Sequence, residues 1–329
     1  LKAKTLTVKD GSSKNGSLKA DILNVAGSFA LGDKTEVGQA AVKGSATLNA
    51  TTLGLTKLDV AQNGQMTATS ALTADELANA GSVDADTVTV NKTLTNNGTL
   101  KAKTLTVKDG SSKNGSLTAE VLNVAGAFEL GTNELKQVNV NGGASLAAQT
   151  LDLASLTVAQ EGELTAADAL TADTVDNAGS VTVKSLVVAT LKGEGTLTAE
   201  NVVFGEKNNL SGFKGAATLN GGTYALTDKN AVRWFGGKTT ITGASVKVNE
   251  LANAEGTLAN MTVDGGSLTV VSGQIFSTAL SDTDYVDDPK AVSTKAGLES
   301  GTLTFVDGKY NVAYASRADA LLKGMKLVF

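Results

Sequence analysis

The sequence contains neither cysteine nor histidine. The absence of cysteine excludes disulfides and thiol nucleophiles. Without either residue type, zinc sites of the usual ligand set and histidine-based acid–base catalysis are excluded as well. Serine is plentiful, but a Ser-His-Asp triad cannot form without histidine. We therefore predict a protein that is not an enzyme and that uses no cofactor.

Aromatic residues and proline are also scarce. Aromatic residues make up 4% of the 329 residues, whereas hydrophobic residues as a whole make up 41%, and Pro289 is the only proline. A core built mainly from Ala, Val, Leu and Thr suits thin stacked layers better than a globular interior of large side chains. Linkers are usually rich in proline and charge, so we expect no linker before about residue 280.

Charge of neither sign is in large excess. The chain has 28 basic and 33 acidic residues, a net charge of −5, and the two signs are interspersed. Such a surface has no electrostatic grip on nucleic acid or anionic lipid. No apolar run approaches the roughly 18 residues that a membrane-spanning helix needs. We predict no nucleic-acid partner and no membrane insertion by this segment.

A long segment of the sequence is duplicated. Residues 1–18 recur unchanged as residues 100–117, and the segment from Ala71 to Val83 returns with three changes from Ala169 to Val181. The offset is 98 to 99 residues, so a module of about 98 residues occurs twice. Because the first residues already lie inside a repeat, we interpret the chain as part of a longer protein.

A shorter repeat of the form G-x-L-x-A-x-x-L-x-V runs through each module. Its side chains alternate with a period of two, which predicts two short strands and excludes a helix. Stacking such units about 4.8 Å apart buries Leu on Leu, Ala on Ala and Val on Val. We therefore predict an all-β fold, a single-stranded parallel β-helix or β-solenoid, with rungs of about 17–20 residues. Copies begin at Gly81, Gly98, Gly115, Gly179 and Gly195.

The repeat loosens after about residue 205, and most aromatic residues follow that point. Large side chains suit a cap that covers the last rung of a solenoid. We predict a β-solenoid over residues 1–275, made of the two modules and looser rungs. Residues 276–329 would then form irregular C-terminal rungs or a cap.

The glycine of each short repeat marks a corner that needs a positive φ or the absence of Cβ. Amide side chains recur two residues before it. Stacked in register, these amides would form a hydrogen-bonded structural ladder. Alternatively, they are present because Asn and Gln tolerate turn conformations. The positions are Gln62, Asn79, Asn96, Asn141, Gln160 and Asn177.

Two clusters lie outside the regular repeat. Asp282, Asp284, Asp287 and Asp288 stand beside the single proline, and we interpret them as a solvated loop. A Ca²⁺ site or a pair of catalytic acids is the alternative, but the spacing lacks the glycine and distal glutamate of an EF-hand.

Arg233, Trp234 and Phe235 form the second cluster, where a cation meets two aromatic rings. This composition is typical of contacts with carbohydrate or with a protein partner. A packing or capping role is the simpler interpretation, because aromatic residues are scarce elsewhere.

The Gly-Ser/Thr-Leu-Thr-Ala rungs, Asn-x-Gly corners, abundant Thr and Ala, and lack of Cys resemble the passenger region of bacterial autotransporter adhesins. The resemblance covers roughly residues 1–275 and lies in repeat style. It implies a right-handed β-helix displayed outside the cell, at the bacterial surface.

We therefore expect an extracellular structural or adhesive protein, a rigid rod whose repetitive face serves adhesion or self-association. Its partners would be glycans or proteins of a host or cell surface, or further copies of itself. A fibre subunit that assembles end to end is the second hypothesis. A polysaccharide-active β-helix enzyme, with Asp282 to Asp288 lining a groove, is a remote third.

Overall fold

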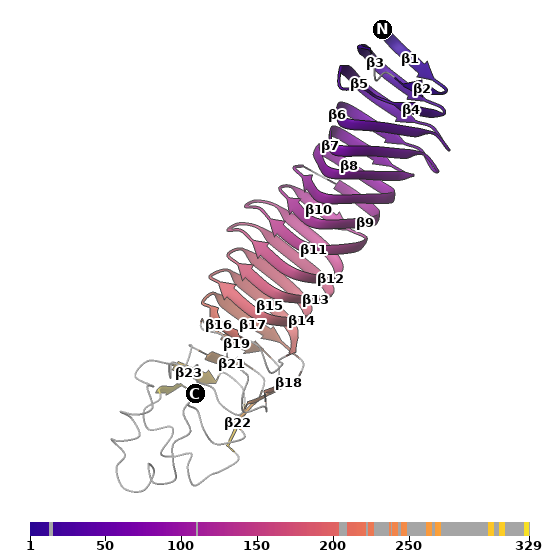
Figure 1. Cartoon of the computed structure of the whole chain (residues 1–329). Coiled ribbons are helices and arrows are strands. Elements are labelled where there is room, and N and C mark those ends of the chain that lie inside the picture. The colour runs from indigo at the N-terminus through magenta and orange to yellow at the C-terminus, as the bar shows by residue number, and fades with distance from the viewer. Residues whose placement is uncertain are drawn as a thin grey trace, which may run out of the picture. The chain divides into compact units, whose positions relative to one another are not determined.

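The fold is all-β, as a computed structural model shows (Figure 1). The structure describes residues 1–12, 16–109, 111–203, 209–221, 223–226, 237, 239–242, 245–248, 261–264, 267–270, 302–305, 309–312 and 326–328. Within these ranges the regular secondary structure consists of strands, and every strand pairing is parallel. None of the described residues belongs to a helix that could cross a membrane. The prediction of a parallel β-solenoid is confirmed.

The chain divides into two compact units, one of residues 1–154 and 161–165, the other of residues 155–160 and 166–329. Strands β1 to β11 lie in the first unit and β14 to β25 in the second, while β12 and β13 contribute to both. The first unit contains β1 (Lys2–Val8), β2 (Gly11–Ser12), β3 (Leu18–Val25), β4 (Ser28–Ala30), β5 (Thr35–Val42), β6 (Thr47–Val60), β7 (Gln65–Asn79), β8 (Ser82–Val107), β9 (Ser111–Val124), β10 (Ala127–Leu130) and β11 (Thr132–Val140). The shared strands are β12 (Ser145–Val158) and β13 (Glu163–Asn177). The second unit continues with β14 (Ser180–Gly193), β15 (Thr196–Val203), β16 (Asn209–Phe213), β17 (Ala216–Asn220), β18 (Thr223–Leu226), β19 (Thr239–Thr242), β20 (Ser245–Val248), β21 (Met261–Asp264), β22 (Ser267–Val270), β23 (Thr302–Phe305), β24 (Lys309–Val312) and β25 (Lys326–Val328).

Each regular turn of the first unit buries three inward-facing pairs of side chains. In the turn between Gly64 and Gly81 the pairs are Met66 with Ala68, Leu72 with Ala74, and Leu77 with Asn79, all at most 2% exposed. The sequence motif predicts only the first two pairs. It misses the third because an asparagine takes the last inward position, where an apolar residue would have revealed the alternation.

Stacking places like residues on like residues, as predicted. Leu100 pairs with Leu117, Ala102 with Ala119, Leu105 with Leu122 and Val107 with Val124. Each leucine and valine of these four pairs is fully buried. Burying one such side chain contributes about 1.5–3 kcal/mol, so the repeated column is the main source of stability.

The two sequence copies do not occupy the same faces of the solenoid. From Leu23 one inward column takes five steps to reach Ser111, whereas Leu122, the counterpart of Leu23, lies 122 − 111 = 11 residues further along its turn. Leu122 instead stacks between Leu105 and Val138, on a different face. One module therefore covers five turns and most of a sixth. The faces accept the same Leu-x-Ala or Leu-x-Val pattern interchangeably.

The repeat glycines are needed for close approach of successive corners. A Cβ built on Gly81, Gly98 or Gly115 would lie 2.1–2.5 Å from the carbonyl oxygen of the preceding glycine in the column. That carbonyl of Gly64 accepts a hydrogen bond from Ser82 N at 2.9 Å, and Gly81 O accepts one from Thr99 N at 2.9 Å. None of these glycines has a positive φ. Of the two sequence-based reasons for glycine, the structure therefore supports the absence of Cβ.

The second unit continues the parallel stacking with longer turns. Ala217 pairs with Thr239 and Thr239 with Met261, two steps of 22 residues each. A separate sheet of β18, β20, β22 and β24 runs with the same register steps. In the C-terminal segment, β23 and β25 pair with each other in parallel. Residues 276–301 lie outside the described residues.

Candidate functional site

Two of the recurring amides form a buried hydrogen-bonded pair in the first unit. Asn79 is 2% exposed and Asn96 is fully buried. Asn79 Nδ2 donates to Asn96 Oδ1 at 2.7 Å and to Thr99 O at 2.9 Å, and Asn79 Oδ1 accepts from Gly81 N at 3.1 Å. Asn96 Nδ2 donates to Ser116 O at 3.1 Å. These amides therefore bond the corners of consecutive turns to one another.

The other amide positions differ from this pair. In the second unit Asn177 is fully buried, donates to Thr196 O at 2.7 Å and accepts from Gly179 N at 3.1 Å. Gln62, Asn141 and Gln160 are exposed residues of wider turns. Those turns contain a residue with positive φ, such as Asn63 at 62° and Gly143 at 73°. The structure thus places three of the six amides inside and three outside.

The two clusters outside the repeat cannot be placed. Arg233, Trp234 and Phe235 lie outside the described residues, and so do Asp282, Asp284, Asp287 and Asp288. Among the described residues, no group of three or more acidic side chains could hold a metal ion.

Outward-facing side chains are also stacked in register. In the first unit Asn123 Nδ2 donates to Thr106 Oγ1 at 3.4 Å, and Asn139 Nδ2 donates to Asn123 Oδ1 at 2.8 Å. These residues occupy one row across three turns. This row was missed from the sequence because its members share no motif. It becomes visible only once the register is known.

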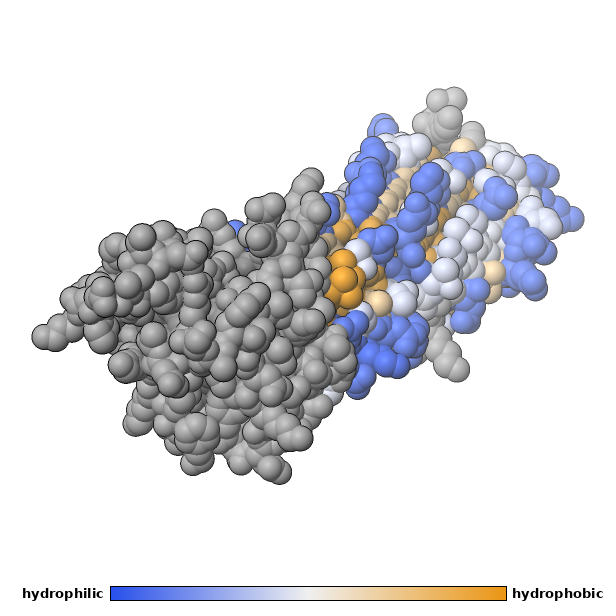
Figure 2. All heavy atoms as spheres, turned by 90° about the horizontal axis from the view of Figure 1, so that it is seen from below, coloured by the Kyte–Doolittle hydropathy of each residue, from blue (hydrophilic) through white to orange (hydrophobic). Residues whose placement is uncertain are grey.

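A corner of the first unit carries charges of alternating sign on successive turns, at Asp86, Lys103, Glu120 and Lys136. Lys103 Nζ lies 2.9 Å from Asp86 Oδ1, and Lys136 Nζ lies 3.6 Å from Glu120 Oε1. The hydrogen bond and charge of Asp86, with a smaller contribution from Glu120, raise the pKa of Lys103. These side chains are at least half exposed, so each pair adds little to stability. Figure 2 shows hydrophilic side chains gathered in rows on the face that it displays.

Acid should weaken the contact between Asp75 and the next turn. Asp75 Oδ1 accepts from Asn91 Nδ2 at 3.1 Å, and Asp75 Oδ2 lies 3.1 Å from Lys92 Nζ. The Asn91 bond, followed by Lys92, holds the pKa of Asp75 below its ordinary value of 3.8. A carboxylate whose pKa is lower in the folded state stabilises above its unfolded pKa, and this contribution is lost as pH falls through the folded pKa.

We therefore expect Asp75→Asn to lose stability less steeply than the wild type as the pH falls below about 4. Urea midpoints measured at pH 7, 4 and 3 for both proteins would show this. Parallel pH profiles would contradict it.

A threonine row runs along the second unit. Thr182, Thr198, Thr218 and Thr240 pair in register at outward positions, and the register continues through Thr262 and Thr304. Thr182 is exposed and the next three are partly exposed. Neighbouring strands lie about 4.8 Å apart, so the row presents hydroxyl and methyl groups at a regular spacing.

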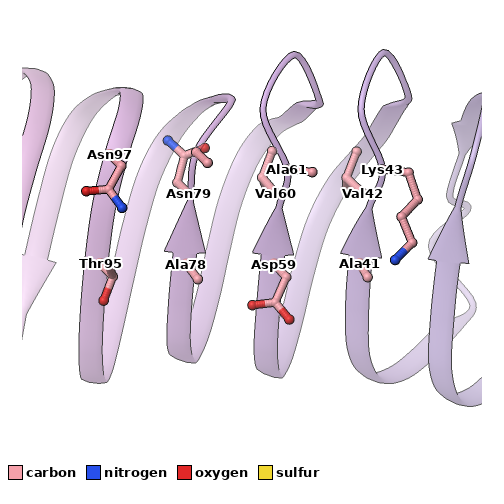
Figure 3. Close-up of a pocket in the computed structure, with 11 residues that line it drawn as sticks. Ala41, Val42, Lys43, Asp59, Val60, Ala61, Ala78, Asn79, Thr95 and Asn97 are labelled. Atoms are coloured by element: carbon pink, nitrogen blue, oxygen red, sulfur yellow. The ribbon is translucent and has the colours of Figure 1, made fainter.

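A hollow of about 220 Å³ lies on the outside of the first unit (Figure 3). It spans four successive turns, and its position follows from one outward row, Asn24, Ala41, Asp59, Ala78 and Thr95. Two small alanines flank Asp59 in that row, so space is left on both sides of the carboxylate. The backbone turns that follow Val42 and Val60 stand out beside it, as Figure 3 shows.

Four polar side chains border the hollow, namely Lys43, Asp59, Thr95 and Asn97. Lys43 and Asn97 are exposed, whereas Asp59 and Thr95 are half-buried. Lys57 Nζ lies 3.6 Å from Asp59 Oδ2 and partly balances its charge. The sequence gave no signal for this site, because register steps of 17, 18 and 19 residues bring its members together.

Comparison with known proteins yields no match to a protein family, to a curated protein or to a solved structure.

Proposed function

We propose that the chain is a structural and adhesive segment of an extracellular protein at a bacterial surface, whose repeated outward rows contact a partner surface. The supporting observation is the in-register repetition of one side-chain chemistry over successive turns, most clearly in the threonine row of the second unit. The partners are glycans or proteins of a cell surface.

Repetition of this kind favours binding through many weak contacts. A single hydroxyl contributes about 0.5–1.5 kcal/mol when it forms a hydrogen bond. Contacts held on one rigid support act together, because the first one raises the effective concentration of the next. An extended polymer or a densely covered surface would therefore be retained, while its isolated building block would not.

The test compares retention of the purified chain on insoluble polysaccharides and on protein-coated surfaces. At about 0.5 kcal/mol per contact, Thr198→Ala should weaken retention about twofold. The triple variant Thr182→Ala, Thr198→Ala and Thr218→Ala should weaken it about tenfold. Circular dichroism should confirm that both variants remain folded.

Two outcomes would overturn the proposal. One is the absence of retention on every surface, and the other is equal retention by the wild type and the triple variant. Electron microscopy over a concentration series tests the fibre alternative, because filaments that lengthen with concentration would make self-assembly the function.

A further inference from the structure

The hollow of the first unit is a local feature of one sequence copy. The second copy has Asn139, Thr157 and Asp176 at the positions of Ala41, Asp59 and Ala78. The two alanines that leave the space are thus replaced by larger polar residues, and the carboxylate is replaced by a hydroxyl. The rest of the strand pattern is the same in both copies, so folding does not require the hollow.

The surface of the hollow combines an apolar floor with polar groups at its border. Ala41 and Ala78 lie in the floor, together with the exposed Ala61 and Ala80 at the turns. Lys43 offers only hydrogen-bond donors, Asp59 only acceptors, and Thr95 and Asn97 offer both. Figure 3 shows Asp59 between Ala41 and Ala78, with Thr95 and Asn97 on one side and Lys43 on the other.

We propose that this hollow binds one pyranose unit of a glycan. A pyranose ring has a C–H face that suits the alanine floor, and hydroxyl groups around its edge that suit the mixed donors and acceptors. The volume of about 220 Å³ lies below the ~300 Å³ at which pockets for drug-sized ligands begin. The hollow is therefore suited to a single ring with the rest of the glycan outside.

This inference deepens the proposed function, since it names a glycan as partner and gives one of its contacts. A shallow site with few hydrogen bonds binds weakly, on the order of 1 mM for a free monosaccharide. Such affinity suffices where many contacts act together.

The experiment is saturation-transfer difference NMR on the full chain with the methyl glycosides of glucose, galactose, mannose, N-acetylglucosamine and glucuronate. We expect the wild type to transfer saturation to at least one of them. The double variant Ala41→Asn and Ala78→Asp fills the hollow with residues that the second copy carries, and it should weaken binding at least tenfold. Asp59→Thr, also taken from the second copy, should weaken binding several-fold without filling the space.

Ser70→Asp is the matched control. Asp168 stands at the equivalent position of the second copy, and Ser70 is exposed and does not border the hollow. This variant adds the same charge as Ala78→Asp and should bind as the wild type does. No transfer to any methyl glycoside, or equal transfer in the filled variant, would overturn the inference. Retention on surfaces by that same variant would show that the proposed function holds without the hollow.

Discussion

Replacing Gly98 by alanine is expected to unfold the corner in which it lies. The new Cβ would stand 2.1 Å from Gly81 O and 2.8 Å from Ala80 C, and both atoms belong to the backbone of the turn before. No rotamer change relieves such a clash, so two turns must move apart. The hydrogen bond from Thr99 N to Gly81 O at 2.9 Å would then be lost or lengthened. A destabilisation of more than about 3 kcal/mol follows from this kind of overpacking.

Gly54→Ala is the control for this prediction. A Cβ at Gly54 meets nothing within 4 Å, its φ is not positive, and the residue is exposed on β6. This substitution should be neutral or should stabilise by up to about 1 kcal/mol.

Hydrogen exchange is the suitable measurement, because each turn of a solenoid contacts only its neighbours and unfolding need not involve the whole chain at once. Amides between Gly81 and Gly115 should exchange faster in Gly98→Ala and unchanged in Gly54→Ala. Native protection at these amides in Gly98→Ala would contradict the close-approach account.

The sequence was sufficient to predict the fold class because the same alternation recurs in every turn. Leu100, Ala102, Leu105 and Val107 stack on the residues that the repeat would place there. The assignment of faces could not be predicted. A module of 98 residues is not a whole number of turns, so Leu23 and Leu122 share a sequence environment but lie on different faces.

Surface features were harder to predict than the core for a related reason. Ala41, Asp59 and Ala78 become neighbours only through steps of 18 and 19 residues, which the repeat of 17 does not give. The extra residues are taken up in wider turns at Ser45 and Asn63, both with positive φ. An inward leucine tolerates this variation because every turn has one, whereas an outward site requires the register of each turn.

The paired amides allow a decisive test of whether they form a ladder or only fit a turn. The same inward column carries Val42 and Val60 in the two turns before Asn79, so valine is accepted there by the fold. Asn96→Val would remove the acceptor of the 2.7 Å bond from Asn79 and the donor to Ser116 O. Asn79→Val would leave Gly81 N and Thr99 O without their amide partners. Each single variant should lose about 1–3 kcal/mol, because buried polar groups are left unpaired.

The double variant then separates the two explanations. If Asn79 and Asn96 stabilise each other through their shared bond, the double variant loses less than the sum of the single losses, by about 1–2 kcal/mol. If each amide serves only its own corner, the losses add to within about 0.5 kcal/mol. Urea unfolding of the four proteins, followed by circular dichroism, measures this coupling. Asn177→Val provides the reference loss for a buried corner amide, because the hydrogen bonds described for Asn177 go only to backbone groups of its own unit. A coupling near zero would mean that the Asn-x-Gly corner, repeated independently in each turn, accounts for these asparagines.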